Sequence, residues 1–265
     1  MTRLDAALAD RGLARSRTHA ARLIADGLVT VNGRGVVKAS HAVSDGDQLA
    51  VAGADHYVSR AAHKLLAALD TFAIDPTGRV ALDMGASTGG FTQVLRERGA
   101  ATVMAVDVGH DQLDPQIASD PAVIAVEGFN VRYMTPENLA GVTGITERPS
   151  LVTADLSFIS LEHVLPAVAA TAAPGADIVL LIKPQFEVGR TAVKGGLVTD
   201  DDTRADAVSR VLWSAWDAGL GVRGLAPSPL VGTHGNCEYL VYLSDANGQN
   251  PTEYRDQIQR MTRRA

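Results

Sequence analysis

The spacing of apolar residues predicts a small α+β unit at the start of the chain. Two apolar stripes keep helical spacing there, one that stops near Gly12 and one that follows Ser16, a residue suited to cap a helix. Residues 29–38 then alternate apolar and polar positions around an Asn-Gly pair, which predicts a hairpin, and residues 48–51 add another short strand.

From Val58 onward, short apolar runs alternate with stretches of helical spacing, which is typical of a mostly parallel sheet with crossover helices. Strands are expected at residues 80–83, 103–107, 123–127, 151–155 and 178–182, with one or two more near Leu225 and at 239–243. Helices are expected at residues 60–69, 90–97, 161–169 and 202–218. The pattern predicts a doubly wound, Rossmann-like α/β domain.

The chain of 265 residues exceeds the usual size of one domain, which agrees with this change of pattern. Residues 53–57 break the periodicity and read as a short linker. We therefore expect a small domain at residues 1–52 and a larger one at residues 58–265.

Composition indicates a folded protein, since 46% of the residues are apolar and 20% are charged. No run of about 20 apolar residues occurs, so we expect no transmembrane helix. The first residues lack the apolar core of a signal peptide, and Cys237 is the single cysteine, which excludes a disulfide framework. The cytoplasm is the expected location, and we assign no metal site.

The net charge of −6 argues against a nucleic-acid partner, but the charge is uneven. Residues 1–52 hold seven Lys or Arg against five Asp or Glu, so the acidic excess lies in the remainder. Arg15 and Arg17 flank the start of the second predicted helix, where backbone N–H groups also favour an anion, and Arg3 extends this surface. The alternative is that these arginines are solvated charges on helix faces.

A glycine-rich turn follows the first strand of the larger domain, and such a turn lets a ligand approach the backbone closely. Asp107 lies 24 residues after Asp83, near the spacing at which an acid meets ribose hydroxyls. The turn matches neither G-x-G-x-x-G nor a P-loop, so a nucleoside cofactor without phosphates is favoured. Asp83 is expected to face a cationic amino-acid portion, as S-adenosylmethionine has. The candidate cofactor residues are Asp83, Gly85, Ala86, Ser87, Gly89, Gly90, Phe91 and Asp107. The alternative is that the glycines only tighten helix packing.

Four charged residues stand near expected strand ends or on the helix before the first strand. Asp155 and Lys183 close the fourth and fifth strands, Glu238 opens the last, and Lys64 lies on the preceding helix. Strand ends of such sheets converge on the ligand site, which makes these residues candidates for chemistry. Each alone also has an ordinary structural explanation as a cap, an ion pair or a surface charge.

Taken together, Lys64, Asp155, Lys183 and Glu238 resemble the catalytic tetrad of FtsJ-type ribose 2′-O-methyltransferases. The chain more closely resembles the TlyA, or hemolysin A, family of bacterial ribosomal RNA cytidine 2′-O-methyltransferases. The likeness is carried by segments 3–7, 12–17, 31–33, 59–64, 83–92, 154–158, 182–187 and 236–239. It implies an RNA-binding domain of the ribosomal protein S4 type and a methyltransferase domain that uses S-adenosylmethionine.

The resemblance also implies roles for the four residues. We expect Lys183 to orient a ribose 2′-hydroxyl and to deprotonate it, the alternative being that Lys183 only stabilises the developing alkoxide. Asp155 is expected to position the lysines, and Glu238 to orient one of them. The linker departs from the family, which carries an arginine and a tryptophan where this chain has residues 55–57. A non-catalytic RNA-binding or ribosome-assembly factor is the alternative, and a membrane-active hemolysin has no visible basis in the sequence. The modified nucleotides and the oligomeric state are left open.

Overall fold

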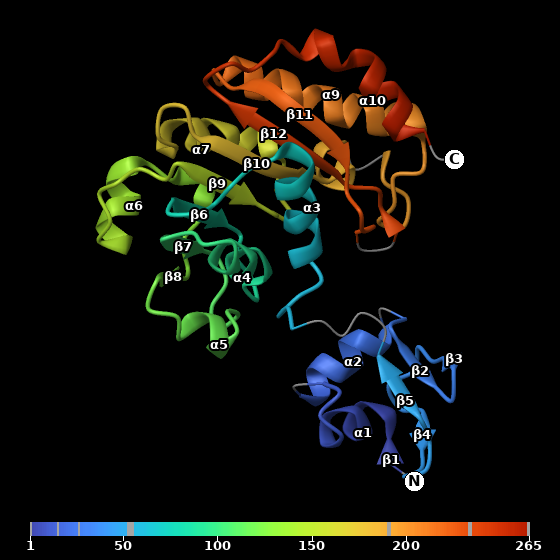
Figure 1. Cartoon of the computed structure of the whole chain (residues 1–265). Coiled ribbons are helices and arrows are strands. Elements are labelled where there is room, and N and C mark those ends of the chain that lie inside the picture. Colours follow the sequence, from blue (N-terminus) through green and yellow to red (C-terminus); the bar gives the residue numbers. More distant parts are fainter. Residues whose placement is uncertain are drawn as a thin grey trace. The chain divides into compact units, whose positions relative to one another are not determined.

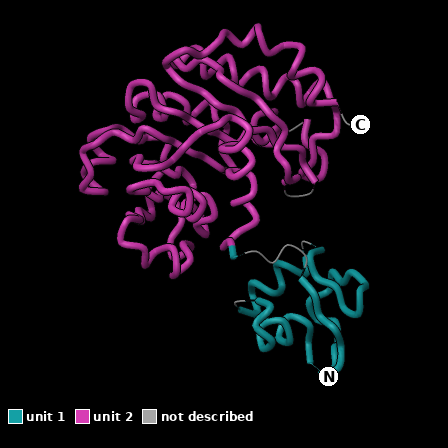
Figure 2. The backbone as a smooth tube through the Cα atoms, in the orientation of Figure 1, with its two compact units in different colours: residues 1–56 teal, residues 57–265 magenta. Residues whose placement is uncertain are grey.

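A computed structural model of the chain describes residues 2–14, 16–25, 27–51, 56–189, 192–232 and 235–263. The chain forms two compact units, residues 1–56 and 57–265 (Figures 1 and 2). Each unit has its own hydrophobic core. The predicted linker falls partly on residues 53–55, which lie outside the described residues, and Tyr57 packs with the second unit.

The first unit packs two helices against short antiparallel strands around a core that includes Leu4, Leu8, Ile24 and Val29. β2 pairs with both β3 and β5, and a separate pair joins β1 to β4. The elements are β1 (Thr2–Arg3), α1 (Leu4–Asp10), α2 (Arg17–Ala25), β2 (Val29–Val31), β3 (Arg34–Gly35), β4 (Ala42–Val43) and β5 (Leu49–Val51).

Local signals explain these boundaries. Ser16 Oγ accepts a hydrogen bond from the His19 N–H at 3.1 Å, so Ser16 caps α2 as predicted. Asn32 and Gly33 both adopt positive φ, 51° and 78°, which fits the tight turn of the predicted hairpin. The pair β1–β4 was not predicted, because two-residue strands are too short to show alternation.

The second unit is built on a seven-stranded sheet with the order β11-β12-β10-β9-β6-β7-β8. The five strands from β6 to β10 run parallel, whereas β12 runs antiparallel to both of its neighbours. The strands are β6 (Val80–Met84), β7 (Thr102–Val106), β8 (Val123–Val126), β9 (Leu151–Ala154), β10 (Asp177–Ile182), β11 (Gly221–Pro227) and β12 (Tyr239–Ser244). The predicted doubly wound α/β fold is confirmed.

Helices cover both faces of this sheet (Figure 1). Successive strand residues point to opposite faces, so Ala81 and Val179 pack with α3 and α4, whereas Leu82 and Leu180 pack with α6, α7, α9 and α10. The helices are α3 (Ala62–Phe72), α4 (Gly90–Glu97), α5 (Pro115–Ala118), α6 (Pro136–Thr143), α7 (Leu165–Thr171), α8 (Pro184–Glu187), α9 (Asp201–Asp217) and α10 (Arg255–Thr262), with short 3₁₀ turns at η1 (Val131–Tyr133), η2 (Leu161–His163) and η5 (Pro251–Tyr254).

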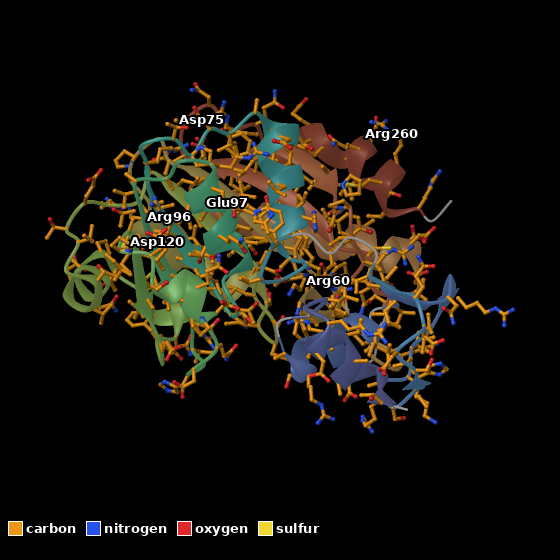
Figure 3. The ribbon with its side chains drawn as sticks, turned by 60° about the horizontal axis from the view of Figure 1, so that its bottom comes forward. Arg60, Asp75, Arg96, Glu97, Asp120 and Arg260 are labelled. Atoms are coloured by element: carbon orange, nitrogen blue, oxygen red, sulfur yellow. The ribbon has the colours of Figure 1, made fainter. Side chains whose placement is uncertain are left out.

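Four helices, α5, α6, α8 and α10, were not predicted. The start of α6 carried a readable signal, because Thr135 and Asn138 form a capping box around Pro136. The helix predicted at residues 161–169 is instead divided into η2 and α7. α4 is tied to the approach to β8 by an ion pair between Arg96 and Asp120, 2.8 Å apart (Figure 3).

Candidate active site

The turn after β6 and the residue after β9 lie at the carboxyl ends of adjacent parallel strands. β7 lies on one side of β6 and β9 on the other, so the chain connections diverge between β6 and β9. In open α/β sheets, ligands bind outside the carboxyl ends of the strands at such a point. Residues 85–90 and Asp155 therefore flank the expected position of a ligand.

The glycine-rich turn requires its glycines. Gly85 and Gly89 have φ values of 82° and 93°, a region that disfavours other residues. A Cβ at Gly85 would lie 2.7 Å from Leu156 Cδ2, and one at Gly89 would lie 2.8 Å from Leu113 Cδ1. Ser87, between them, also has positive φ, 48°. The turn is thus held in a conformation that ordinary residues adopt at a cost, which is common at ligand sites.

Gly90 brings the start of α4 against the segment that leads into α3. A Cβ at Gly90 would lie 2.6 Å from Ser59 Oγ and 3.2 Å from the Ala62 nitrogen. Lys64 lies in the first turn of α3. The close approach at Gly90 therefore couples the glycine-rich turn to the helix that carries Lys64.

Asp107 braces the same turn. Its Oδ2 accepts a hydrogen bond from the Ser87 N–H at 2.8 Å, and its Oδ1 accepts one from the Gly109 N–H at 2.7 Å. Each carboxylate oxygen has a second lone pair, so these bonds leave acceptor capacity for a ligand hydroxyl. Asp107 thus links the end of β7 to the turn after β6.

Asp83 is buried, with 1% of its surface exposed. Thr92 Oγ1 donates a hydrogen bond to its Oδ2 at 2.7 Å, and Thr153 Oγ1 donates one to Oδ1 at 3.2 Å. Burial raises the pKa of this carboxyl to about 7, although the threonine hydrogen bonds oppose the shift. Both oxygens of Asp83 therefore have protein partners, and the ligand-facing role expected from the sequence stays a prediction.

Ala86 and Phe91, two other candidate cofactor residues, are almost fully buried. Ala86 packs with Val58 and Ile117, and Phe91 packs with residues of α3. The Ala86 N–H donates to the Val106 carbonyl at 3.1 Å. Their side chains shape the turn from within the core.

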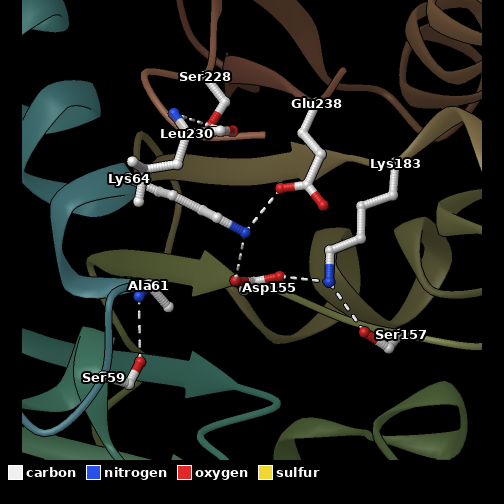
Figure 4. Close-up of polar contacts among 9 residues, drawn as sticks. All are labelled: Ser59, Ala61, Lys64, Asp155, Ser157, Lys183, Ser228, Leu230 and Glu238. Atoms are coloured by element: carbon white, nitrogen blue, oxygen red, sulfur yellow. Dashed lines mark hydrogen bonds and ion pairs between the residues drawn. The ribbon is translucent and has the colours of Figure 1, made fainter. Parts of the chain in front are cut away.

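The structure brings Lys64, Asp155, Lys183 and Glu238 into one cluster, in which Asp155 is partly buried and the other three are buried (Figure 4). Lys64 Nζ lies 2.6 Å from Glu238 Oε2 and 3.4 Å from Asp155 Oδ2. Lys183 Nζ lies 2.6 Å from Asp155 Oδ1. Asp155 therefore stands between the two amines, and these four residues are called the tetrad below.

The charges of the tetrad balance, with two amines facing two carboxylates. Burying an isolated charge is costly, whereas paired charges with hydrogen bonds are tolerated. Asp155 Oδ1 is paired but not hydrogen-bonded. Its contact with Lys183 is an ion pair without hydrogen-bond geometry, and it accepts no hydrogen bond from the described residues. This oxygen retains acceptor capacity beside Lys183.

Gly232 makes room for Glu238. A Cβ at this position would lie 2.0 Å from Glu238 Oε1 and 2.7 Å from Glu238 Cδ. The Gly232 N–H also donates to the Asn236 carbonyl at 2.8 Å, which closes the loop ahead of β12. The position of the Glu238 carboxylate thus depends on the absence of a side chain at Gly232.

Sequence reasoning did not assign Ser157 or Glu187 to the site. Ser157 Oγ accepts a hydrogen bond from Lys183 Nζ at 2.9 Å. Glu187 is buried and accepts hydrogen bonds from Ser160 Oγ at 2.6 Å and from the Leu161 N–H at 3.0 Å. Both residues lie inside segments that carried the family resemblance, and this was the signal that could have found them.

The predicted RNA-binding arginines of the first unit converge on one carboxylate. Arg3 donates two hydrogen bonds to Asp5, at 3.0 Å each, and Arg17 lies 3.3 Å from the same carboxylate. Hydrogen bonds from Arg3, joined by that from Arg17, lower the pKa of Asp5 to about 2, while its desolvation opposes the shift. The Arg3 and Arg17 side chains are 52% and 62% exposed, so both guanidinium groups still reach solvent. Arg15 lies outside the described residues.

Across the parts of the chain that the structure describes, no three His, Cys, Asp or Glu side chains form a group suited to hold a metal ion. In the same residues, no helix is both long and apolar enough to span a membrane.

Comparison with known families agrees with both units. Residues 57–245 match the FtsJ-like methyltransferase family, and residues 2–49 match the S4 domain. The chain is 50% identical over 244 residues to the 16S/23S rRNA (cytidine-2′-O)-methyltransferase TlyA of Mycobacterium tuberculosis, an alignment that covers 91% of this chain and 89% of that protein. It is 37% identical to Hemolysin A of Brachyspira hyodysenteriae, over 91% of this chain and 99% of the relative.

A solved structure shares the architecture. The "putative hemolysin" of Streptococcus thermophilus superposes with a TM-score of 0.78 at 36% sequence identity, covering 98% of this chain and 94% of the other. The family match spans most of the chain, and the M. tuberculosis relative covers nearly all of it. The chain therefore belongs to the FtsJ-like methyltransferase family and, within it, to the TlyA family.

Proposed function

We propose that this protein transfers a methyl group from S-adenosylmethionine to the 2′-hydroxyl of cytidine in ribosomal RNA, in the cytoplasm. The observation that carries the proposal is the largely buried tetrad at the carboxyl ends of the parallel strands, next to a glycine-rich turn. The similarity of the chain to TlyA of M. tuberculosis, which is named as an rRNA (cytidine-2′-O)-methyltransferase, supports ribosomal RNA as the substrate and the 2′-hydroxyl of cytidine as the position that is methylated.

The turn suits a nucleoside cofactor. Gly85 and Gly89 hold the turn in a left-handed conformation that leaves no room for a Cβ, Ser87 between them is exposed, and Asp107 keeps acceptor capacity for ribose hydroxyls. Residues 85–90 and Asp107 would hold S-adenosylmethionine, with the Asp83 carboxyl close to the same turn. When bound, this cofactor supplies a methyl group already activated by its sulfonium.

The protein must then align the hydroxyl and help remove its proton. Lys183, once it has released its own proton, orients the 2′-hydroxyl and accepts the hydroxyl proton on Nζ as the oxygen attacks the methyl carbon and the thioether product leaves. Asp155 holds Lys183 at 2.6 Å and also contacts Lys64. Glu238 fixes Lys64, so the second amine stays beside Asp155 and places positive charge near the developing alkoxide.

The first unit would position the RNA. Arg3, Arg17 and the undescribed Arg15 would contact phosphates, which fix register and orientation rather than sequence. The first unit would hold structured ribosomal RNA through its shape and its phosphates. The target nucleotide would then rotate out of the RNA toward the tetrad.

Mapping 2′-O-methylation on ribosomal RNA from cells with and without the protein tests this proposal. The expected result is loss of methylation at one or more cytidines, restored by the wild-type protein and by no tetrad variant. Unchanged methylation in the deleted strain, with no transfer to purified ribosomal subunits, would favour the non-catalytic alternative.

A further inference from the structure

Lys183 is held by a hydroxyl that lies outside the tetrad. Ser157, two residues after Asp155 on the loop that leaves β9, accepts a hydrogen bond from Lys183 Nζ at 2.9 Å (Figure 4). This bond has proper hydrogen-bond geometry, whereas the contact of Lys183 with Asp155 Oδ1 is an ion pair alone. Ser157 therefore supplies the directional contact to the amine.

The geometry of a lysine amine gives this contact a consequence. Beyond its bond to Cε, a tetrahedral Nζ has three directions for protons or a lone pair. In Lys183, the hydrogen bond to Ser157 takes one of these directions, the Asp155 ion pair holds the amine from another side, and Nζ has no further polar partner among the described residues. The directional bond to Ser157, added to the ion pair, restricts the orientation of Nζ, whereas the ion pair alone would leave a long, flexible side chain free to rotate about it.

The loop that carries Ser157 is itself anchored next to Lys183. Glu187, four residues after Lys183 in α8, accepts hydrogen bonds from Ser160 at 2.6 Å and from the Leu161 N–H at 3.0 Å. Glu187 is buried, and desolvation raises its pKa. The segment 183–187 thus carries Lys183 and, through Glu187, also holds the loop that carries Ser157.

The backbone beyond Ser157 adopts an uncommon conformation. Phe158 has a φ of 66°, a left-handed value that is strained for an aromatic residue. Its side chain is largely exposed and contacts the Phe186 ring, with centroids 5.3 Å apart. Such strain persists only where surrounding contacts impose it, and it gathers at functional sites.

We propose that Ser157 is a positioning residue for methyl transfer. Its hydroxyl and Asp155 together direct the remaining position of Lys183 Nζ toward the attacking 2′-hydroxyl. Ser157 takes up no proton itself, since Lys183 is the acceptor. The inference rests on the proposed function and adds a fifth residue to the site.

The test compares Ser157→Ala and Ser157→Thr with a matched control, Ser160→Ala. Ser160 lies on the same loop, and within the described part of the chain its hydroxyl bonds Glu187 rather than Lys183. Methyl transfer is measured with S-adenosylmethionine and ribosomal subunits purified from cells that lack the protein. Cofactor affinity is measured separately by calorimetry, and folding by thermal unfolding.

Ser157→Ala is expected to lower kcat by about 10- to 100-fold, as for loss of a hydrogen bond to a charged group, with KM for the subunits and cofactor affinity changed less than about twofold. Ser157→Thr keeps the hydroxyl at an exposed position and should recover most of the rate. Ser160→Ala should lose less than about threefold, because Lys183 keeps both of its contacts and the Leu161 N–H still ties the loop to Glu187.

Three results would overturn the inference: a kcat for Ser157→Ala within about twofold of wild type, an equal loss in Ser160→Ala, or a raised KM with kcat unchanged. The last would make Ser157 an RNA contact. Absence of methyl transfer by the wild-type protein would instead contradict the proposed function, so the two failures are distinguishable.

Discussion

Ile182 of β10 pairs with Tyr239 of β12 in antiparallel register. Lys183 follows the last residue of one strand and Glu238 precedes the first residue of the next, so both emerge at the same edge of the sheet. With β12 reversed, Glu238 would lie a strand length away, roughly 20 Å for six residues. The antiparallel direction of β12 therefore completes the tetrad.

Lys183→Ala should abolish methyl transfer while leaving the cofactor site intact. Loss of a general base typically lowers the rate by about 10²- to 10⁴-fold, and Lys183 is not among the residues proposed to hold the cofactor. Single-turnover methyl transfer and calorimetric titration with S-adenosylmethionine measure the two effects. Lys194→Ala, which removes the same charge outside the tetrad, is the control. Near-normal turnover in Lys183→Ala would remove Lys183 from the mechanism.

Gly232→Ala should lower activity without disrupting the fold. Its Cβ would lie 2.0 Å from Glu238 Oε1, so the carboxylate must move away from Lys64. We expect a loss of about tenfold or more in methyl transfer, equivalent to roughly 1.4 kcal/mol in the barrier. Gly141→Ala, in α6 with nothing within 4 Å of its Cβ, is the matched control and should keep full activity. Equal activity of the two variants would show that Glu238 need not hold its place.

Asp83→Asn should become more stable relative to wild type as the pH rises. Burial raises the pKa of Asp83 from 3.8 to about 7, so the folded protein holds this proton more tightly than the unfolded chain. Wild type therefore loses stability between about pH 4 and about pH 7, by up to about 4 kcal/mol from this residue, whereas the uncharged variant does not.

Thermal unfolding of both proteins from about pH 5 to about pH 8 measures that difference. Asp75→Asn is the control, because hydrogen bonds from Thr77 lower the pKa of Asp75 and its titration lies below this interval. A difference between wild type and Asp83→Asn that stays constant over the interval would contradict a raised pKa at Asp83.

Arg3→Ala combined with Arg17→Ala should weaken binding to ribosomal RNA. If both guanidinium groups contact phosphates, the negative slope of log affinity against log salt concentration becomes shallower by about two. Filter binding at several salt concentrations measures the slope. Arg98→Ala, which removes an arginine paired with Asp70 in the second unit, is the control. An unchanged slope in the double variant would place RNA recognition elsewhere in the chain.

Local patterns predicted most elements, because periodicity and turn residues act over a few positions. The helix predicted at residues 90–97 has the same bounds in the structure. Contacts between distant segments carried no such signal: neither the Ser157–Lys183 bond nor the space that Gly232 leaves for Glu238 follows from spacing. Asp83 was expected to face a ligand, yet its two threonine partners depend on the packing of β6 with α4 and β9.

The direction of β12 was within reach of sequence reasoning. Eleven residues, 228–238, join β11 to β12, and they show no helical spacing. A parallel crossover needs a dozen or more residues and usually a helix, so a short connection without one favours an antiparallel strand. Because β11 follows β10 through α9 and runs parallel to it, an antiparallel β12 places Glu238 at the same edge of the sheet as Lys183.

Lys64 and Glu238, which touch at 2.6 Å, are 174 positions apart along the polypeptide. During synthesis, the first of them leaves the ribosome long before its partner has been translated. The nascent enzyme therefore stays inert until its final β-strand has docked, and a product truncated ahead of that strand is expected to lack turnover even if its earlier strands fold.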